Sequence, residues 1–134
     1  MHRTSKLLLA LSMALASTTA MAELVKLDNS DLFRSGTLYT DPALNKKAGN
    51  VVTFTIITDY DNPLGFRKGQ AYSHIDQSAY DCEKKLVKSL VDTHFDGRMG
   101  KGNVVNSYDP SGNWNPVNPG TRGEQDWKAA CGKK

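Results

Sequence analysis

The segment Val51–Tyr60 (VVTFTIITDY) places the strongest constraint on the fold of this 134-residue chain. Its β-branched and aromatic residues follow a period of two, so that Val52 and Phe54 lie on one side. Side chains of a strand point alternately to the two faces of a sheet. We therefore predict a strand with one well-buried face, and we expect the turn residues of 61–65 (DNPLG) to break it.

Shorter strands are predicted on both sides of this segment. They share β-branched or aromatic residues bounded by turn residues, and they cover Leu24–Leu27, Phe33–Tyr39, Ala71–Cys82 and Gly102–Tyr108. Lys46–Asn50 (KKAGN) is predicted to be the loop of a hairpin that leads into the long strand.

Two structures fit the segment Glu83–Phe95. Its apolar residues Leu86, Val87, Leu90 and Val91 have the spacing of one helical face, and they could equally belong to a strand with a bulge. Periodicity alone favours the helix.

The C-terminal segment has clear helix signals. Thr121 and Glu124 form a capping box, Trp127 and Cys131 share one face, and Gly132 is a natural stop. The fold class predicted from these elements is α+β, a small antiparallel β-sheet with a C-terminal α-helix.

Residues Met1–Ala22 have the three zones of a cleavable signal peptide. Basic residues precede the uncharged apolar run Leu7–Ala16, and small residues at Ala20 and Ala22 predict cleavage between Ala22 and Glu23. A membrane anchor is the alternative, but so short a run spans poorly a hydrocarbon core that needs about 20 residues. We expect an exported protein, periplasmic or secreted to the cell surface, whose remaining 112 residues form one domain.

The chain has two cysteines, Cys82 and Cys131, and both follow the predicted cut. An even number of cysteines in an oxidising compartment favours a disulfide, which would link the C-terminal helix to the end of a strand. A reactive cysteine nucleophile is the less favoured alternative, because thiols outside the cytoplasm tend to be oxidised. No cysteine directly follows the cut, so no stable membrane anchor is expected after cleavage.

Charge argues against nucleic acid as a partner. The formal net charge is +3, and loss of Arg3 and Lys6 with the signal peptide lowers it to about +1. The basic residues Lys84, Lys85 and Lys88 are either a solvated face or a binding patch for an acidic partner.

The sequence contains no recognisable catalytic constellation. His74 and His94 lie twenty residues apart without neighbouring cysteine or carboxylate at metal-ligand spacing, so they predict no metal site. The glycine motif of dinucleotide-binding proteins and the elbow motif of serine hydrolases are both missing. We predict no catalytic residues, no cofactor and no enzymatic activity.

A set of motifs in the second half of the chain resembles the surface-adhesin protein E family. The motifs are Tyr80-Asp81-Cys82, Gly100-x-Gly102-x-Val104-Val105, Trp114-x-Pro116-Val117-x-Pro119-Gly120-Thr121, Glu124-x-x-Trp127 and Cys131-Gly132. The resemblance implies a small antiparallel sheet joined to a C-terminal helix by the cysteine pair, with Lys85–Phe95 as a strand. It also implies that residues 23–134 are an adhesin E-like domain.

The best-known members of this family are lipid-anchored and bind host extracellular-matrix and serum proteins, including vitronectin and laminin. The resemblance therefore implies an exported, non-enzymatic binding protein with a protein ligand, in the form of a monomer or a homodimer through strand pairing. The alternative is a periplasmic envelope or inhibitor protein with no adhesive role.

Overall fold

The computed structural model describes residues 23–27 and 35–133. The predicted signal peptide, Met1–Ala22, lies outside the described residues, and Glu23 is exposed at their start. The strand predicted at Phe33–Tyr39 is found as Gly36–Thr40, with its first two predicted residues outside the described part. None of the helices in the described part is long and apolar enough to cross a membrane.

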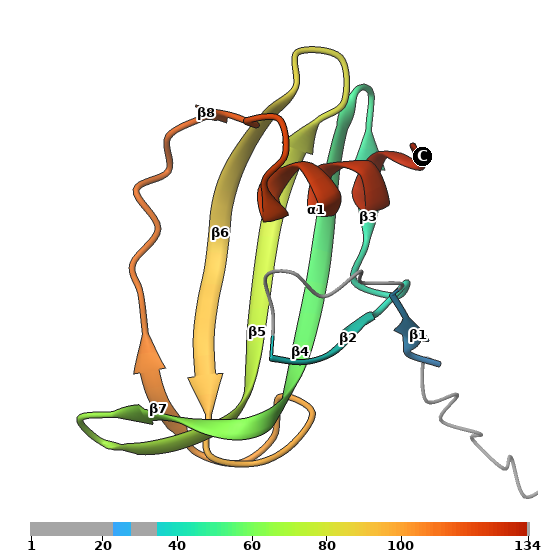
Figure 1. The fold of residues 1–134 in the computed structure, drawn as a ribbon. Coiled ribbons are helices and arrows are strands. Elements are labelled where there is room, and N and C mark those ends of the chain that lie inside the picture. The colour runs from blue at the N-terminus through green and yellow to red at the C-terminus, as the bar shows by residue number, and fades with distance from the viewer. Residues whose placement is uncertain (1–22, 28–34, 134) are drawn as a thin grey trace, which may run out of the picture.

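The described chain forms one antiparallel sheet with a single helix against it (Figure 1). The strands and the helix are β1 (Val25–Lys26), β2 (Gly36–Thr40), β3 (Lys46–Ala48), β4 (Val51–Phe66), β5 (Gly69–Asp81), β6 (Leu86–Phe95), β7 (Val104–Ser107), β8 (Asn115–Pro116) and α1 (Arg122–Cys131). The strand order is β1-β2-β4-β5-β6-β7, with β3 paired to β4 and β8 paired to β6. This confirms the predicted fold class.

The core lies between α1 and one face of the sheet. It contains the predicted buried side of β4 together with side chains from four other segments, and its buried members are Leu38, Val52, Phe54, Ile56, Tyr80, Val117 and Trp127. The other side of β4 is also buried where Thr55 accepts a hydrogen bond from the Gln77 side chain and its backbone amide donates to Asn45. The long strand therefore has two buried faces near its centre, where one was predicted.

The predicted break at 61–65 was wrong, because β4 continues to Phe66. Its pairing with β5 shifts register between Asp59 and Leu64, so the residue-by-residue pairing of the two strands is interrupted from residue 60 to residue 63. Pro63 lacks a backbone N–H, and an irregularity of this kind accommodates it without ending the strand. The predicted loop at Lys46–Asn50 was also partly wrong, since its first three residues form β3 and only two residues make the turn.

The helix favoured by periodicity at Glu83–Phe95 was wrong, and the strand implied by the family resemblance is confirmed. The strand β6 has a register shift against β5, which leaves Leu90 without a partner between Ser89 and Val91. A bulge of one residue breaks the alternation of two, and the apolar residues on its two sides then mimic helical spacing.

The C-terminal helix is confirmed with its predicted caps. The Thr121 hydroxyl accepts a hydrogen bond from the Glu124 amide, and Gly132 has the left-handed conformation at the other end, with φ of 65°. Trp127 is buried on the sheet side and donates from its indole nitrogen to the Asp81 carbonyl at 3.0 Å. The predicted disulfide Cys82–Cys131 closes next to this contact, with a Cα–Cα distance of 5.7 Å.

The turn between β5 and β6 is tied to α1 by an ion pair. The Lys85 ammonium lies 2.7 Å from the Glu124 carboxylate and 5.3 Å from the centre of the Trp127 ring. The hydrogen bond from Lys85, a backbone hydrogen bond from Gly120 and the nearby positive charges hold the pKa of Glu124 below its usual value of 4.5. Lys85 therefore has a structural partner within the domain.

We expect thiol titration of the native protein to find no free cysteine. Replacement of both cysteines by serine (C82S/C131S) should lower the free energy of unfolding by about 4 kcal/mol, because the bond closes a long loop in the unfolded chain. Urea unfolding of the two proteins measures the difference. A reactive thiol in the native protein, or equal stability, would contradict the disulfide.

We expect Glu124→Gln to remove a part of the pH dependence of stability. A carboxyl group with a lowered folded pKa stabilises the protein above its unfolded pKa, and that contribution is lost as the pH falls below about 4.5. Urea midpoints of wild type and variant should therefore differ most near pH 6 to 7 and converge in acid. In a Lys85→Met background the substitution should have a smaller effect, and an undiminished effect there would show that another partner sets the pKa.

Candidate functional site

The pairing of β5 with β6 brings together two histidines and a carboxylate. His74 lies directly opposite His94, and Asp92 precedes His94 by two residues on the same strand. All three side chains therefore lie on one face of the sheet. It is the face covered by α1, because Tyr80, which packs in the core with Trp127, has the same alternation along β5 as His74.

The three side chains form a close group. One nitrogen of each imidazole and one oxygen of Asp92 all lie within 4.8 Å of one another. The His74 Nε2 is 2.6 Å from the Asp92 Oδ1, and the His94 Nδ1 is 3.9 Å from the same oxygen. The two imidazole rings are stacked, with centroids 4.1 Å apart and planes inclined by 13°.

His94 is the buried member of the group, with 9% of its side chain exposed. Burial and, to a smaller degree, the nearby His74 lower the pKa of His94 to about 4, although Asp92 acts in the opposite direction. His94 is therefore a neutral imidazole at neutral pH. The ring also packs on Phe66, which the end of the β4–β5 hairpin brings to 4.5 Å between centroids.

The histidines belong to a row of side chains that runs across β5, β6 and β7. Two buried polar atoms of this row have no hydrogen-bond partner in the described part of the chain. Among the described residues, the buried side-chain atoms in this state are the His94 Nδ1 and the Asn106 Nδ2. The two residues are themselves opposite each other on β6 and β7. An unpaired buried polar group costs about 1–3 kcal/mol, so this row is a place where a ligand would stabilise the protein.

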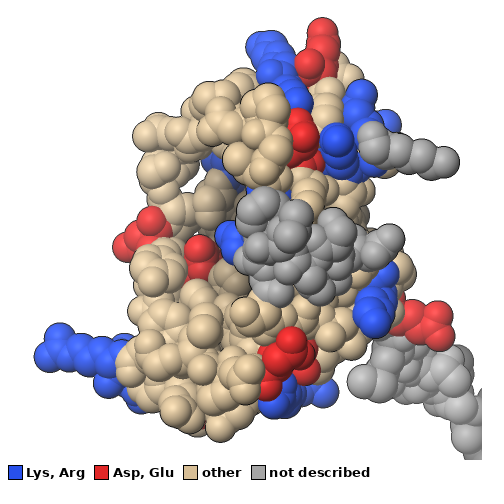
Figure 2. Space-filling view, viewed as in Figure 1, with Lys and Arg blue, Asp and Glu red and all other residues tan. Residues whose placement is uncertain are grey.

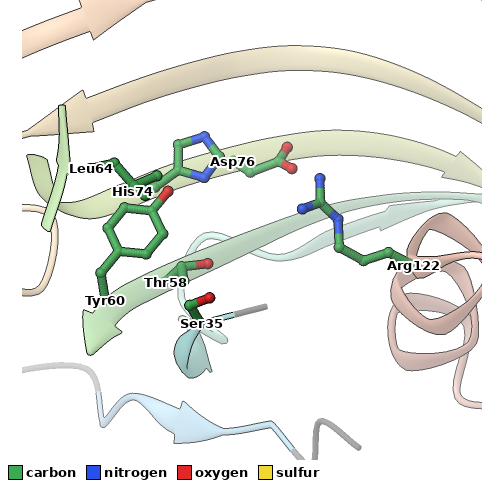
Figure 3. A pocket seen from close by; sticks show the side chains of 7 residues that line it. All are labelled: Ser35, Thr58, Tyr60, Leu64, His74, Asp76 and Arg122. Atoms are coloured by element: carbon green, nitrogen blue, oxygen red, sulfur yellow. The ribbon is translucent and has the colours of Figure 1, made fainter. Parts of the chain in front are cut away.

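A pocket of about 190 Å³ lies beside the histidines, between the sheet and the start of α1 (Figure 3). Its lining residues are Ser35, Thr58, Tyr60, Leu64, His74, Asp76 and Arg122. Figure 3 shows the Arg122 side chain extending from the helix toward Asp76. The pocket thus has one basic and one acidic side chain and opens onto one face of His74, an arrangement suited to a small polar ligand or ion.

Sequence spacing could not reveal the whole group, although Asp92 stands only two residues before His94 and was overlooked as a candidate ligand. The metal-ligand spacings used for sequence analysis describe ligands close together in a helix or a loop, and His74 and His94 are twenty residues apart. They meet because a hairpin folds β6 back on β5. A correct strand assignment for both segments, with the bulge included, is the signal that would have found them.

The structure places Lys84 and Lys85 of the predicted patch in the turn between β5 and β6 and Lys88 on β6, and it separates their roles. Lys85 pairs with Glu124, and the Lys88 ammonium lies 5.0 Å from the centre of the Trp114 ring. Lys84 is exposed in the turn.

Other exposed lysines join Lys84 at this end of the molecule. Lys46 and Lys47 lie on β3, and the turn from β3 into β4 contacts the β5–β6 turn. The Asn50 side-chain amide donates to the Glu83 carboxylate, and the Asn50 backbone carbonyl accepts from the Cys82 backbone amide. Figure 2 shows basic side chains gathered at this end, with a few acidic ones between them. We call Lys46, Lys47 and Lys84 the basic end.

Comparison with known proteins identifies the fold. Two crystal structures of protein E from Haemophilus influenzae are similar to this chain, one at 17% identity with a TM-score of 0.59, covering 81% of this chain and 96% of that protein. The other, from a non-typeable strain, has 15% identity, a TM-score of 0.58 and coverage of 82% and 84%. A search of curated proteins finds no match.

The sequence itself matches a family model over nearly all of the described residues. The model is that of surface-adhesin protein E, and the match runs from residue 25 to residue 132. It spans the sheet, the helix and both cysteines. The chain therefore belongs to the surface-adhesin protein E family.

Proposed function

We propose that this protein is an exported, non-enzymatic adhesin that binds an acidic segment of a host extracellular-matrix or serum protein. The observation that supports this most directly is the match to the surface-adhesin protein E family across residues 25–132. A family of surface adhesins implies a protein that works outside the cytoplasm, in agreement with the predicted signal peptide.

The basic end is the surface that we assign to this contact. Lys46, Lys47 and Lys84 are exposed, and each adds a positive charge at one end of a domain whose overall charge is nearly balanced. A local patch of one sign speeds and orients the encounter with a partner of the opposite sign. Binding through such a patch weakens as salt screens the charges.

Lys85 and Lys88 contribute less to this surface than the sequence predicted. Lys85 is held by Glu124, and Lys88 lies over the exposed ring of Trp114. A lysine over an aromatic ring can still contact a partner together with that ring, so Lys88 and Trp114 form a second contact point next to the basic end.

A homodimer through paired edge strands is part of the same proposal. The outer strands β1, β3, β7 and β8 have two, three, four and two residues. Edges this short, with lysines on β3, oppose stable pairing between copies. We therefore expect a dimer of this kind to be weak.

Reversal of charge at the basic end tests the proposed adhesion. The triple variant K46E/K47E/K84E should bind immobilised laminin or vitronectin roughly tenfold or more weakly than the wild type at low salt, because it removes the attraction that steers the encounter. Surface plasmon resonance of the oxidised protein, residues 23–134, measures the change over a range of salt concentrations.

The matched control is R67E/K68E/K101E, which makes the same change in charge at three exposed residues outside the basic end. It should bind within about twofold of the wild type. Equal weakening by both triple variants would show that only total charge matters. No binding by the wild type at any salt concentration would favour the envelope or inhibitor function without adhesion.

A further inference from the structure

We propose that His74, Asp92 and His94 form a binding site for one divalent transition-metal ion such as zinc. The site lies on the sheet, away from the basic end, and it does not depend on the proposed adhesion. Three features of the group support it: the types of its atoms, their separations, and the unpaired nitrogen of His94.

The donor atoms are of the right chemical types. Two imidazole nitrogens and one carboxylate oxygen are common ligands of zinc, and a set of three protein ligands leaves a fourth position for water. The two cysteines are joined to each other and cannot compete for the ion in the oxidised protein.

The separations are close to those that a tetrahedral ion requires. Metal–ligand bonds of about 2.0–2.1 Å place two tetrahedral ligands about 3.3 Å apart. The observed distances to the Asp92 Oδ1 are 2.6 Å from the His74 Nε2 and 3.9 Å from the His94 Nδ1. These values lie on either side of the required one. Because the two rings are stacked with planes inclined by 13°, binding also requires the imidazoles to turn until both nitrogens point at the ion, while the sheet stays in place.

The unpaired His94 Nδ1 favours a ligand over a purely structural cluster. A hydrogen bond between His74 and Asp92 would satisfy those two residues, but it leaves the buried nitrogen of His94 without a partner. An ion held between the three residues would bond to that nitrogen as well. Metal binding at the His74 Nε2 replaces its hydrogen bond to Asp92, and the proton of the neutral imidazole then lies on Nδ1.

The ion has a path to this group. His74 forms part of the wall of the pocket in Figure 3, and 14% of its side chain is exposed. The pocket volume of about 190 Å³ is several times the share of one water in the liquid, about 30 Å³. A partly hydrated ion can therefore approach His74 and keep water as its remaining ligand.

Titration with zinc chloride tests the site directly. The protein, residues 23–134, is produced without a polyhistidine tag, oxidised, freed of metal by a chelator and followed by isothermal titration calorimetry at pH 7.5. We expect one zinc ion per chain with saturable binding. His74→Gln and Asp92→Asn should each weaken binding tenfold or more, since each removes a ligand.

Asp76→Asn is the matched control. Asp76 lies opposite Asp92 on β5 and lines the pocket, but it is outside the three-residue group, so its substitution should change affinity less than threefold. An affinity that Asp92→Asn leaves unchanged, or that Asp76→Asn lowers as much, would overturn the assignment.

A second measurement needs no variant. His74 and His94 are the histidines that follow residue 22, so an NMR spectrum of imidazole nitrogens should contain signals from these two rings alone. Zinc coordination should shift one nitrogen of each ring in proportion to bound metal. Unchanged imidazole signals at saturating zinc, as expected if a buried water satisfies the Nδ1 of His94, would refute the site.

Discussion

The bulge at Leu90 determines which side chains of β6 face the helix. Before it, Val87 lies opposite Tyr80 and packs against the core. After it, the alternation changes by one residue, and His94 faces the same side as Val87 although their positions differ by an odd number. Without the extra residue, a strand that buried Val87 would turn His94 and Asp92 to the opposite face. The core and the histidine group both depend on this single irregularity.

Local signals in the sequence predicted much of the fold. The alternation of Val51–Tyr60 and the capping residues around α1 act within a few residues, and the structure confirms a strand and a helix there. The cysteine pair was predicted from the oxidising compartment and is found as a disulfide. These elements are predictable because their determinants are neighbours in the chain or covalently paired.

The remainder depended on contacts between distant residues. Pro63 stays within β4 because β5 accommodates a register shift, and Leu90 mimics helical spacing because of a bulge that only pairing with β5 defines. Lys84, Lys85 and Lys88 looked like one continuous basic patch in the sequence. In the structure, however, Lys85 forms an ion pair with Glu124, some forty residues later. The histidine group was missed for the same reason, since hairpin pairing and not spacing brings His74 to His94. Sequence patterns predict such partners poorly because tertiary contacts select them.

The two proposed sites occupy different parts of one sheet. From His74 to Asp81 the strand β5 covers roughly 23 Å at its usual rise per residue, and the basic end begins beyond that point. A partner that contacts only the basic end therefore does not touch His74. This separation allows the two activities to evolve, and to fail, independently of each other.

The link between Cys82 and Cys131 also has a mechanical consequence if the protein is an adhesin as proposed. A pulling force applied to the chain on both sides of this link passes directly through the sulfur atoms. The 48 residues between them, which include β6, β7, β8 and most of α1, then carry no tension. At about 3.4 Å per extended residue, some 160 Å of chain is withheld from stretching. Under tension the histidine group would lose only His74, which lies on β5, while Asp92 and His94 remain in the segment that carries no tension.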